Sequence, residues 1–154
     1  MKIKLKNLGP LQETEFEIGD FTIICGKNNT GKTYATYATY GFFDFLNKGY
    51  SIYPEKDAVN QLFSKGKVIL DLFAYAKKAD KIISTAGKEY SSILFNVFAA
   101  KESLFKNADF TAEFTIKDEY LQESKSFESG STERSLLQIT KEPGSNELTV
   151  SLIM

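Results

Sequence analysis

The sequence has no histidine, and this absence narrows the chemistry open to the protein. Catalysis by Ser-His-Asp or Cys-His arrangements and zinc binding through histidine are excluded, because each needs an imidazole. The single cysteine, Cys25, cannot form a disulfide within the chain, which suits a reducing compartment. Any reaction must therefore use carboxylates, lysines, hydroxyls and backbone groups.

Arginine and long apolar runs are also scarce. Arg134 is the only arginine, which disfavours a small-molecule kinase, since kinases that clamp phosphates usually use several such donors. No apolar run approaches the ~20 residues of a membrane span, and residues 1–10 lack the apolar core of a secretory signal. We therefore expect a cytoplasmic protein with no membrane partner.

The overall composition is that of a soluble globular protein. The 154 residues are 42% hydrophobic and 25% charged, and the formal net charge is -1. A length of this order predicts a single domain, residues 1–154. Because the charge is nearly balanced, the protein as a whole does not attract nucleic acid, and only a local basic patch could bind it.

Hydrophobic periodicity predicts the elements of the first third of the chain. Residues 2–6 and 11–18 alternate polar and apolar positions, which predicts a hairpin with its lysines on a solvated face or edge. Residues 21–25 are mostly apolar and β-branched, as in a central strand buried on both faces, so we expect Cys25 to be a buried structural thiol. Residues 31–46 have helical spacing and predict an amphipathic helix.

The remainder of the chain divides into a helical and a strand-like part. Residues 57–106 predict a helical region that Gly87 breaks or bends into two helices, and residues 109–154 predict antiparallel strands. The serine-rich stretch 123–135 predicts a flexible polar loop, and the turn residues at 143–146 predict a hairpin. The apolar end of the chain suggests a fragment of a longer or split protein; a native edge strand is the alternative.

A phosphate-binding motif follows the predicted strand 21–25. The pattern G-x-x-x-x-G-K-[ST] is matched by Gly26, Lys27, Asn28, Asn29, Thr30, Gly31, Lys32 and Thr33. The glycines let consecutive N–H groups turn toward phosphate oxygens, and the following helix adds its positive N-terminal end. Lys32 would reach the β- and γ-phosphates, Thr33 would ligate Mg²⁺, and Tyr34 would offer only its backbone N–H.

The motif therefore predicts a nucleotide-binding core in residues 1–47, with ATP and Mg²⁺ as ligands. The alternative is a glycine-containing turn with a coincidental lysine. Tyr34, Tyr37 and Tyr40 recur at every third position of the predicted helix. They could stack on a base, but packing in the core or at an interface is favoured.

Hydrolysis needs a carboxylate that holds Mg²⁺ and orients water, and the sequence does not identify one. Asp71 ends the apolar run "VILD", but its neighbours Ile69, Leu72, Phe73 and Ala76 fall on a helical stripe. This spacing predicts that Asp71 lies on the solvated face of a helix and not at a strand end. The stretch "ESGSTERS", residues 128–135, lacks paired glycines and a following helix, so a flexible loop is preferred to a second phosphate-binding element.

The segment "IKLKNLGPLQETEFEIGDFTIICGKNNTGKT" resembles the N-terminal part of ABC-type ATPases of the SMC/RecF/OLD group. These are AAA-like ATPases of DNA repair and anti-phage defence, and the resemblance extends to about Phe45. It implies an α/β P-loop NTPase fold, an ABC-ATPase-like N-terminal lobe. This lobe would contain a starting β-hairpin, a P-loop strand and helix, a helical middle and C-terminal antiparallel strands.

The resemblance also implies a nucleotide held between two ATPase heads, with Gly26 to Thr33 on the phosphates and Mg²⁺. An arginine that follows the first strand and contacts nucleotide in many relatives is replaced here by Leu8-Gly9-Pro10. The Ser-Gly-Gly signature, the Asp-Glu pair and the histidine switch of these ATPases belong to a C-terminal half that this sequence does not contain.

Three functions are consistent with the sequence. The leading one is an ATP-binding lobe that hydrolyses ATP only with the other half and a partner head, with DNA or a defence effector as further partners of the complete protein. The second is a module in which ATP gates association without turnover. The third is a small P-loop phosphotransferase in which Asp71 or a later acidic residue assists Mg²⁺.

Overall fold

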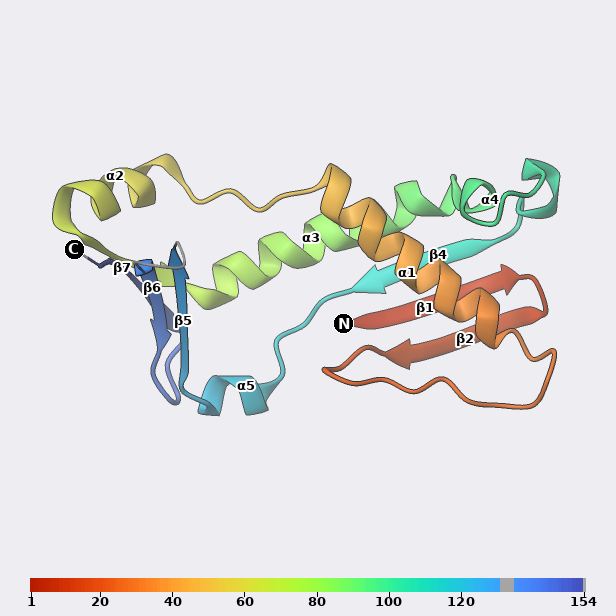
Figure 1. The fold of residues 1–154 in the computed structure, drawn as a ribbon, viewed down its shortest axis with the longest axis horizontal. Helices are drawn as coiled ribbons and strands as arrows, with labels where there is room; N and C mark the ends of the chain where they lie inside the picture. The colour runs from red at the N-terminus through yellow and green to blue at the C-terminus, as the bar shows by residue number, and fades with distance from the viewer. Residues whose placement is uncertain (131–134, 154) are drawn as a thin grey trace. The chain divides into compact units, whose positions relative to one another are not determined.

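The computed structural model describes residues 1–130 and 135–153. They fall into two compact units, one formed by residues 1–51 and 79–115 and the other by residues 52–78 and 116–154. Figure 1 shows the elements of both units in chain order. The long helix α3 (Leu72–Ser91) contributes residues to each unit.

The first unit contains a three-stranded antiparallel sheet in the order β2-β1-β4. Its strands are β1 (Lys2–Leu8), β2 (Leu11–Glu17) and β4 (Asp109–Glu113). The predicted starting hairpin is therefore confirmed, and β1 is its central strand. Ile3, Leu5 and Leu8 are fully buried on one face of the sheet.

The other face of this sheet carries the lysines of β1, each opposite a glutamate. The ammonium of Lys4 lies 2.9 Å from the Glu13 carboxylate, and that of Lys2 lies 2.7 Å from Glu15. Hydrogen bonding and charge attraction from Lys4 lower the pKa of Glu13 below its usual value. The lysine row is thus a neutralised, solvated face and not a basic surface.

Helix α1 (Lys32–Gly49) confirms the helix predicted after the motif, and it buries Ala35, Ala38 and Phe42. The Phe42 ring lies 4.7 Å, centroid to centroid, from that of Phe110 on β4. Tyr90 of α3 completes this aromatic core and donates a hydrogen bond of 2.9 Å to the carbonyl of Ala38. The core therefore fixes the helix whose first two residues, Lys32 and Thr33, end the motif.

Helix α3 continues through Gly87, so the prediction that this glycine divides the helical region was wrong. A Cβ at Gly87 would lie 3.2 Å from the backbone nitrogen of Ala112 in β4. The glycine is needed for the close approach of helix and strand, which outweighs its low helix propensity. Helix α4 (Leu94–Val97) and the 3-10 helix η1 (Glu102–Leu104) connect α3 to β4.

The segment 21–25 is not a strand, and this corrects a central prediction. Phe21 and Ile23 are 83% and 70% exposed, and Cys25 is also exposed instead of buried. A buried strand needs paired neighbours on both edges, and no strand among the described residues pairs with this segment. Its apolar composition alone therefore does not make it a strand.

The second unit contains a four-stranded antiparallel sheet in the order β3-β7-β6-β5. The strands are β3 (Lys67–Asp71), β7 (Glu147–Leu152), β6 (Ser135–Lys141) and β5 (Lys125–Gly130). Helix α2 (Lys56–Lys65) contacts β3 and β7, where Val68 and Val150 are buried. The hairpin predicted around residues 143–146 is confirmed as β6–β7.

Two strands of this sheet lie where the sequence predicted other structures. β3 occupies residues 67–71 inside the predicted helical region, because it pairs with β7 far along the chain. β5 occupies residues 125–130, where a polar loop was expected, because it pairs with β6. Residues 131–134 of that predicted loop, Arg134 among them, lie outside the described residues.

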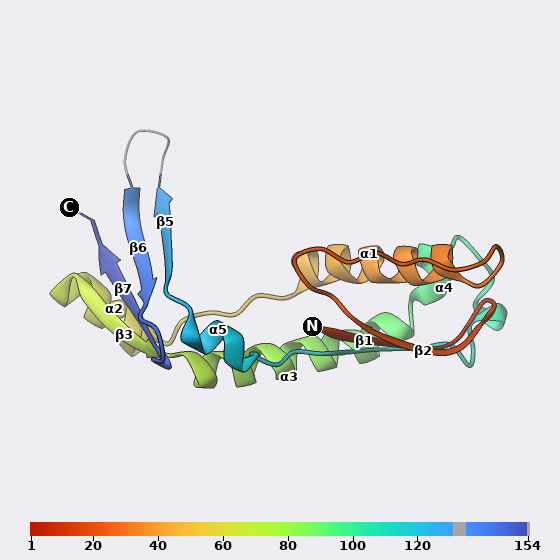
Figure 2. The ribbon, with the colours of Figure 1, turned by 90° about the horizontal axis from the view of Figure 1, so that it is seen from below.

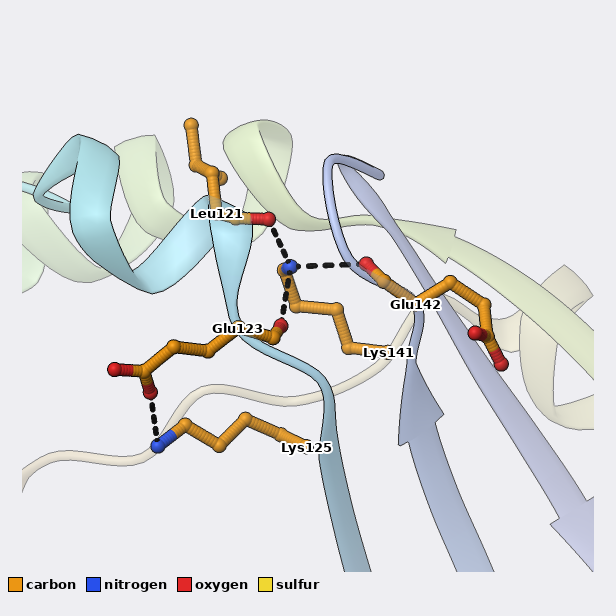
Figure 3. Close-up of polar contacts among 5 residues, drawn as sticks. All are labelled: Leu121, Glu123, Lys125, Lys141 and Glu142. Carbon is orange, nitrogen blue, oxygen red and sulfur yellow. Dashed lines mark hydrogen bonds and ion pairs between the residues drawn. The ribbon is translucent and has the colours of Figure 1, made fainter.

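A buried lysine joins the short helix α5 (Asp118–Gln122) to the end of β6, as Figure 3 shows. Lys141 is only 5% exposed, and its ammonium donates to the carbonyls of Leu121 at 2.6 Å and Glu123 at 3.0 Å. A third hydrogen bond of 3.1 Å reaches the carbonyl of Glu142. The lysine thereby satisfies carbonyls at the C-terminal end of α5, which a helix leaves unpaired.

Candidate functional site

The motif residues form a loop that leads directly into α1. Gly31, the residue before the helix, has a left-handed backbone with φ of 90°, and Asn29 has φ of 60°. Glycine adopts a positive φ without steric cost, which explains why this residue type stands at the helix start. The loop therefore depends on a glycine at the point where it enters the helix.

Lys32 lies folded back over this loop. Its ammonium donates to the carbonyl oxygens of Gly26 at 2.8 Å and Lys27 at 2.5 Å. The hydroxyl of Thr30 donates to the same Lys27 carbonyl at 2.8 Å. These bonds close the loop into a ring around the lysine and hold a positive charge beside the start of α1.

A cavity of about 680 Å³ opens at this loop. It is lined by Pro10 and by the consecutive residues Asn28, Asn29, Thr30, Gly31, Lys32, Thr33 and Tyr34. Gly26 and Lys27 are not among its lining residues, but their carbonyls hold the Lys32 ammonium. The size is that of a small-molecule site, for which about 300–1,000 Å³ is typical.

The chemistry of the cavity suits an anion. Backbone N–H groups at the start of a helix have no partner within the helix, and the helix dipole makes this end positive. The first turn of α1 contains no acidic residue that would compete for these groups. With Lys32 beside it and no carboxylate in its lining, the cavity can hold phosphate oxygens.

Comparison with known proteins identifies the family of the chain. A family model described as an AAA ATPase domain matches residues 1–152. The chain belongs to this family. Membership indicates a nucleotide-binding ATPase that binds ATP, usually with Mg²⁺, and agrees with the mixed α/β architecture. No curated protein and no solved structure matches the chain.

In this AAA ATPase domain the three tyrosines after the motif have different surroundings. The ring of Tyr34 stacks on Phe98, with centroids 5.0 Å apart, so the predicted packing role is confirmed for this residue. Tyr37 and Tyr40 are 58% and 76% exposed and are not core residues. For these two residues, packing at an interface and stacking on a base both stay predictions.

Asp71, the weak candidate for a magnesium ligand, lies at the end of β3, so its predicted place on the exposed face of a helix was wrong. Its carboxylate accepts hydrogen bonds from the backbone nitrogens of Phe73 at 2.9 Å and Ala74 at 3.3 Å. Asp71 thus caps the start of α3, as aspartate commonly does. Within the described ranges, no group of three or more acidic or cysteine side chains could hold a metal ion.

The turn between β1 and β2 contributes to the site, although the sequence did not predict this contribution. Pro10, from this turn, lines the cavity although it stands far before the motif in the sequence. In the sequence, the only indication of this role was that Leu8-Gly9-Pro10 stands where many relatives have an arginine that contacts nucleotide.

No helix in the described part of the chain combines the length and apolar character needed to cross a bilayer.

Replacing Gly31 by alanine is expected to distort the loop of this AAA ATPase domain. A Cβ at this position would lie 2.5 Å from Cγ of Leu11, and alanine would also be strained at φ of 90°. We expect ATP affinity to fall about fivefold and stability to fall by about 1–2 kcal/mol. Isothermal titration and urea unfolding measure the two effects, and Gly49→Ala is a control because nothing lies within 4 Å of its added Cβ. Wild-type affinity in Gly31→Ala would contradict the assigned role of the glycine.

Proposed function

We propose that the chain is the ATP-binding lobe of an ABC/OLD-like ATPase, in which residues 26–34 hold the triphosphate. The observation that carries the proposal is the cavity at the start of α1, which is lined by consecutive motif residues that include Lys32. Phosphate charge and this arrangement of cation and helix N-terminus are complementary.

Magnesium fits the same site through Thr33. Its side chain is exposed and lines the cavity directly after Lys32. A hydroxyl oxygen is a suitable ligand for Mg²⁺, which also takes phosphate oxygens and water. When bound, the ion would neutralise charge on the β- and γ-phosphates. The chain's own contribution is to orient the triphosphate and present this hydroxyl.

Hydrolysis, in this proposal, requires the other half of the ATPase and a partner head. Two observations support this view. The described residues contain no cluster of acidic side chains for the metal. The segment 21–25, which leads into the loop, pairs with no described strand and exposes the apolar side chains of Phe21 and Ile23, so this surface beside the loop is free to contact another polypeptide.

The same unpaired segment also fits the second function, ATP-gated association without turnover. Phosphate release by the complete protein separates the two, because only the hydrolytic ATPase produces it. A phosphotransferase is disfavoured because the Asp71 carboxylate is engaged as the cap of α3. DNA repair or phage defence, with DNA or an effector as partner, remains the proposed setting.

Replacing Thr33 by valine tests the metal site without changing side-chain shape. We expect Mg²⁺ to strengthen ATP binding about tenfold in the wild type and at most twofold in Thr33→Val, with equal affinities in EDTA. Isothermal titration with and without Mg²⁺ measures this difference. Thr36→Val is the matched control, because the Thr36 hydroxyl donates to the Lys32 carbonyl within α1. Full enhancement by Mg²⁺ in Thr33→Val would contradict the assignment.

A further inference from the structure

The turn between β1 and β2 contacts the loop and the start of α1 at two points. A Cβ on Gly9 would lie 2.6 Å from the Tyr34 ring, so the backbone of Gly9 rests directly on that ring. The Leu11 side chain lies equally close to Gly31, where an added Cβ would be 2.5 Å from its Cγ. Pro10 stands between these two contacts, and Figures 1 and 2 both show the turn beside the start of α1.

The turn is also held from its other side. The Asn7 side-chain amide donates a hydrogen bond of 3.0 Å to the carbonyl of Asn107. The Tyr34 ring, on which Gly9 rests, is itself stacked on Phe98. Proline adds a φ fixed by its ring, so Pro10 faces the cavity as a rigid surface.

The cavity therefore has a chemically mixed lining. The run Asn28 to Tyr34 supplies the polar groups that suit phosphates, and Pro10 adds an apolar ring. The prolyl ring contains no hydrogen-bond donor or acceptor and offers only apolar surface. Sugars and bases have apolar faces that can pack on such a ring, whereas phosphates cannot gain from it.

We propose that Pro10 is the nucleoside-contacting wall of the site and makes it accept nucleoside triphosphates without selecting the base. This inference rests on the proposed phosphate site and adds the position of the nucleoside, beyond Tyr34 and against Pro10. Because the ring cannot hydrogen-bond to a base edge, adenine and guanine are held equally by this wall. The base therefore gains apolar contact with the Pro10 ring but no hydrogen bond from it that would distinguish one base from another.

Binding of ATP, GTP and inorganic tripolyphosphate to the whole chain tests the inference. For the wild type we expect ATP and GTP affinities within threefold of one another and weaker binding of tripolyphosphate. Pro10→Ala removes two ring carbons and is expected to weaken ATP and GTP about five- to tenfold while leaving tripolyphosphate unchanged. Pro10→Val, which restores apolar bulk, is expected to recover most of the loss.

The controls separate this inference from the phosphate site itself. Pro54→Ala, at an exposed position before α2, is expected to bind all three ligands as the wild type does. Lys32→Ala is expected to weaken all three, tripolyphosphate included. If Lys32→Ala behaves so while Pro10→Ala leaves the ratio of ATP to tripolyphosphate affinity unchanged, the phosphate site stands and the role of Pro10 is refuted. A preference above thirtyfold for one base would refute the lack of base selection, and wild-type failure to bind any ligand would refute both proposals.

Discussion

Replacing Lys32 by alanine is expected to lower the affinity for ATP by about 10- to 100-fold. Lys32 lines the cavity, and a hydrogen bond to a charged group contributes about 1.5–3 kcal/mol. In the free protein the Lys32 ammonium is bonded to the carbonyls of Gly26 and Lys27, so it is already positioned beside the loop. Isothermal titration with ATP and Mg²⁺ measures the loss.

Two further variants show whether the loss comes from the charge. Lys32→Met keeps the aliphatic stem and is expected to lose as much affinity as Lys32→Ala. Lys65→Ala is the matched control, because Lys65 is an exposed lysine in the last turn of α2 and does not line the cavity. We expect Lys65→Ala to bind ATP within about twofold of the wild type. Equal affinities of wild type and Lys32→Ala would remove the basis for a phosphate site at residues 26–34.

Features set by neighbouring residues could be predicted from the sequence. The hairpin of β1 and β2 has clear alternation and a glycine-proline turn, and α1 has helical spacing without an interrupting proline. The motif is also local, since its loop and the following helix start are consecutive. In each case the neighbouring residues alone favour the structure that forms, so it could be predicted without knowing which distant residues it contacts.

Features set by distant partners could not be predicted in this way. The run at 67–71 has a helical stripe next to it, and only its pairing with β7 makes it a strand. The run at 21–25 has strand composition, but no described strand pairs with it. For the candidate site, Pro10 was missed for the same reason: its place in the cavity depends on how the β1–β2 turn packs on Tyr34 and Gly31.

The internal lysine of the second unit illustrates how such a distant contact can be tested. Replacing Lys141 by methionine keeps the volume and the stem but removes all three hydrogen bonds shown in Figure 3. The carbonyls of Leu121, Glu123 and Glu142 then lose a charged donor. The Leu121 and Glu142 carbonyls keep hydrogen bonds from the backbone nitrogens of Gly144 and Ser145, at 2.7 and 3.2 Å. We therefore expect a loss of stability of about 1–3 kcal/mol, which comes from the lost bonds to a charged donor.

Hydrogen exchange measured by mass spectrometry locates this effect. In Lys141→Met, the amides of α5 and of the β6–β7 hairpin are expected to exchange faster, while those of α1 and β1 keep their wild-type rates. Lys125→Met is the matched control in the same region. Its ion pair with Glu123 joins two side chains that are 61% and 49% exposed, and such pairs contribute little to stability. Unchanged protection of α5 in Lys141→Met would show that the three carbonyls are satisfied without the ammonium and that the lysine does not anchor the helix.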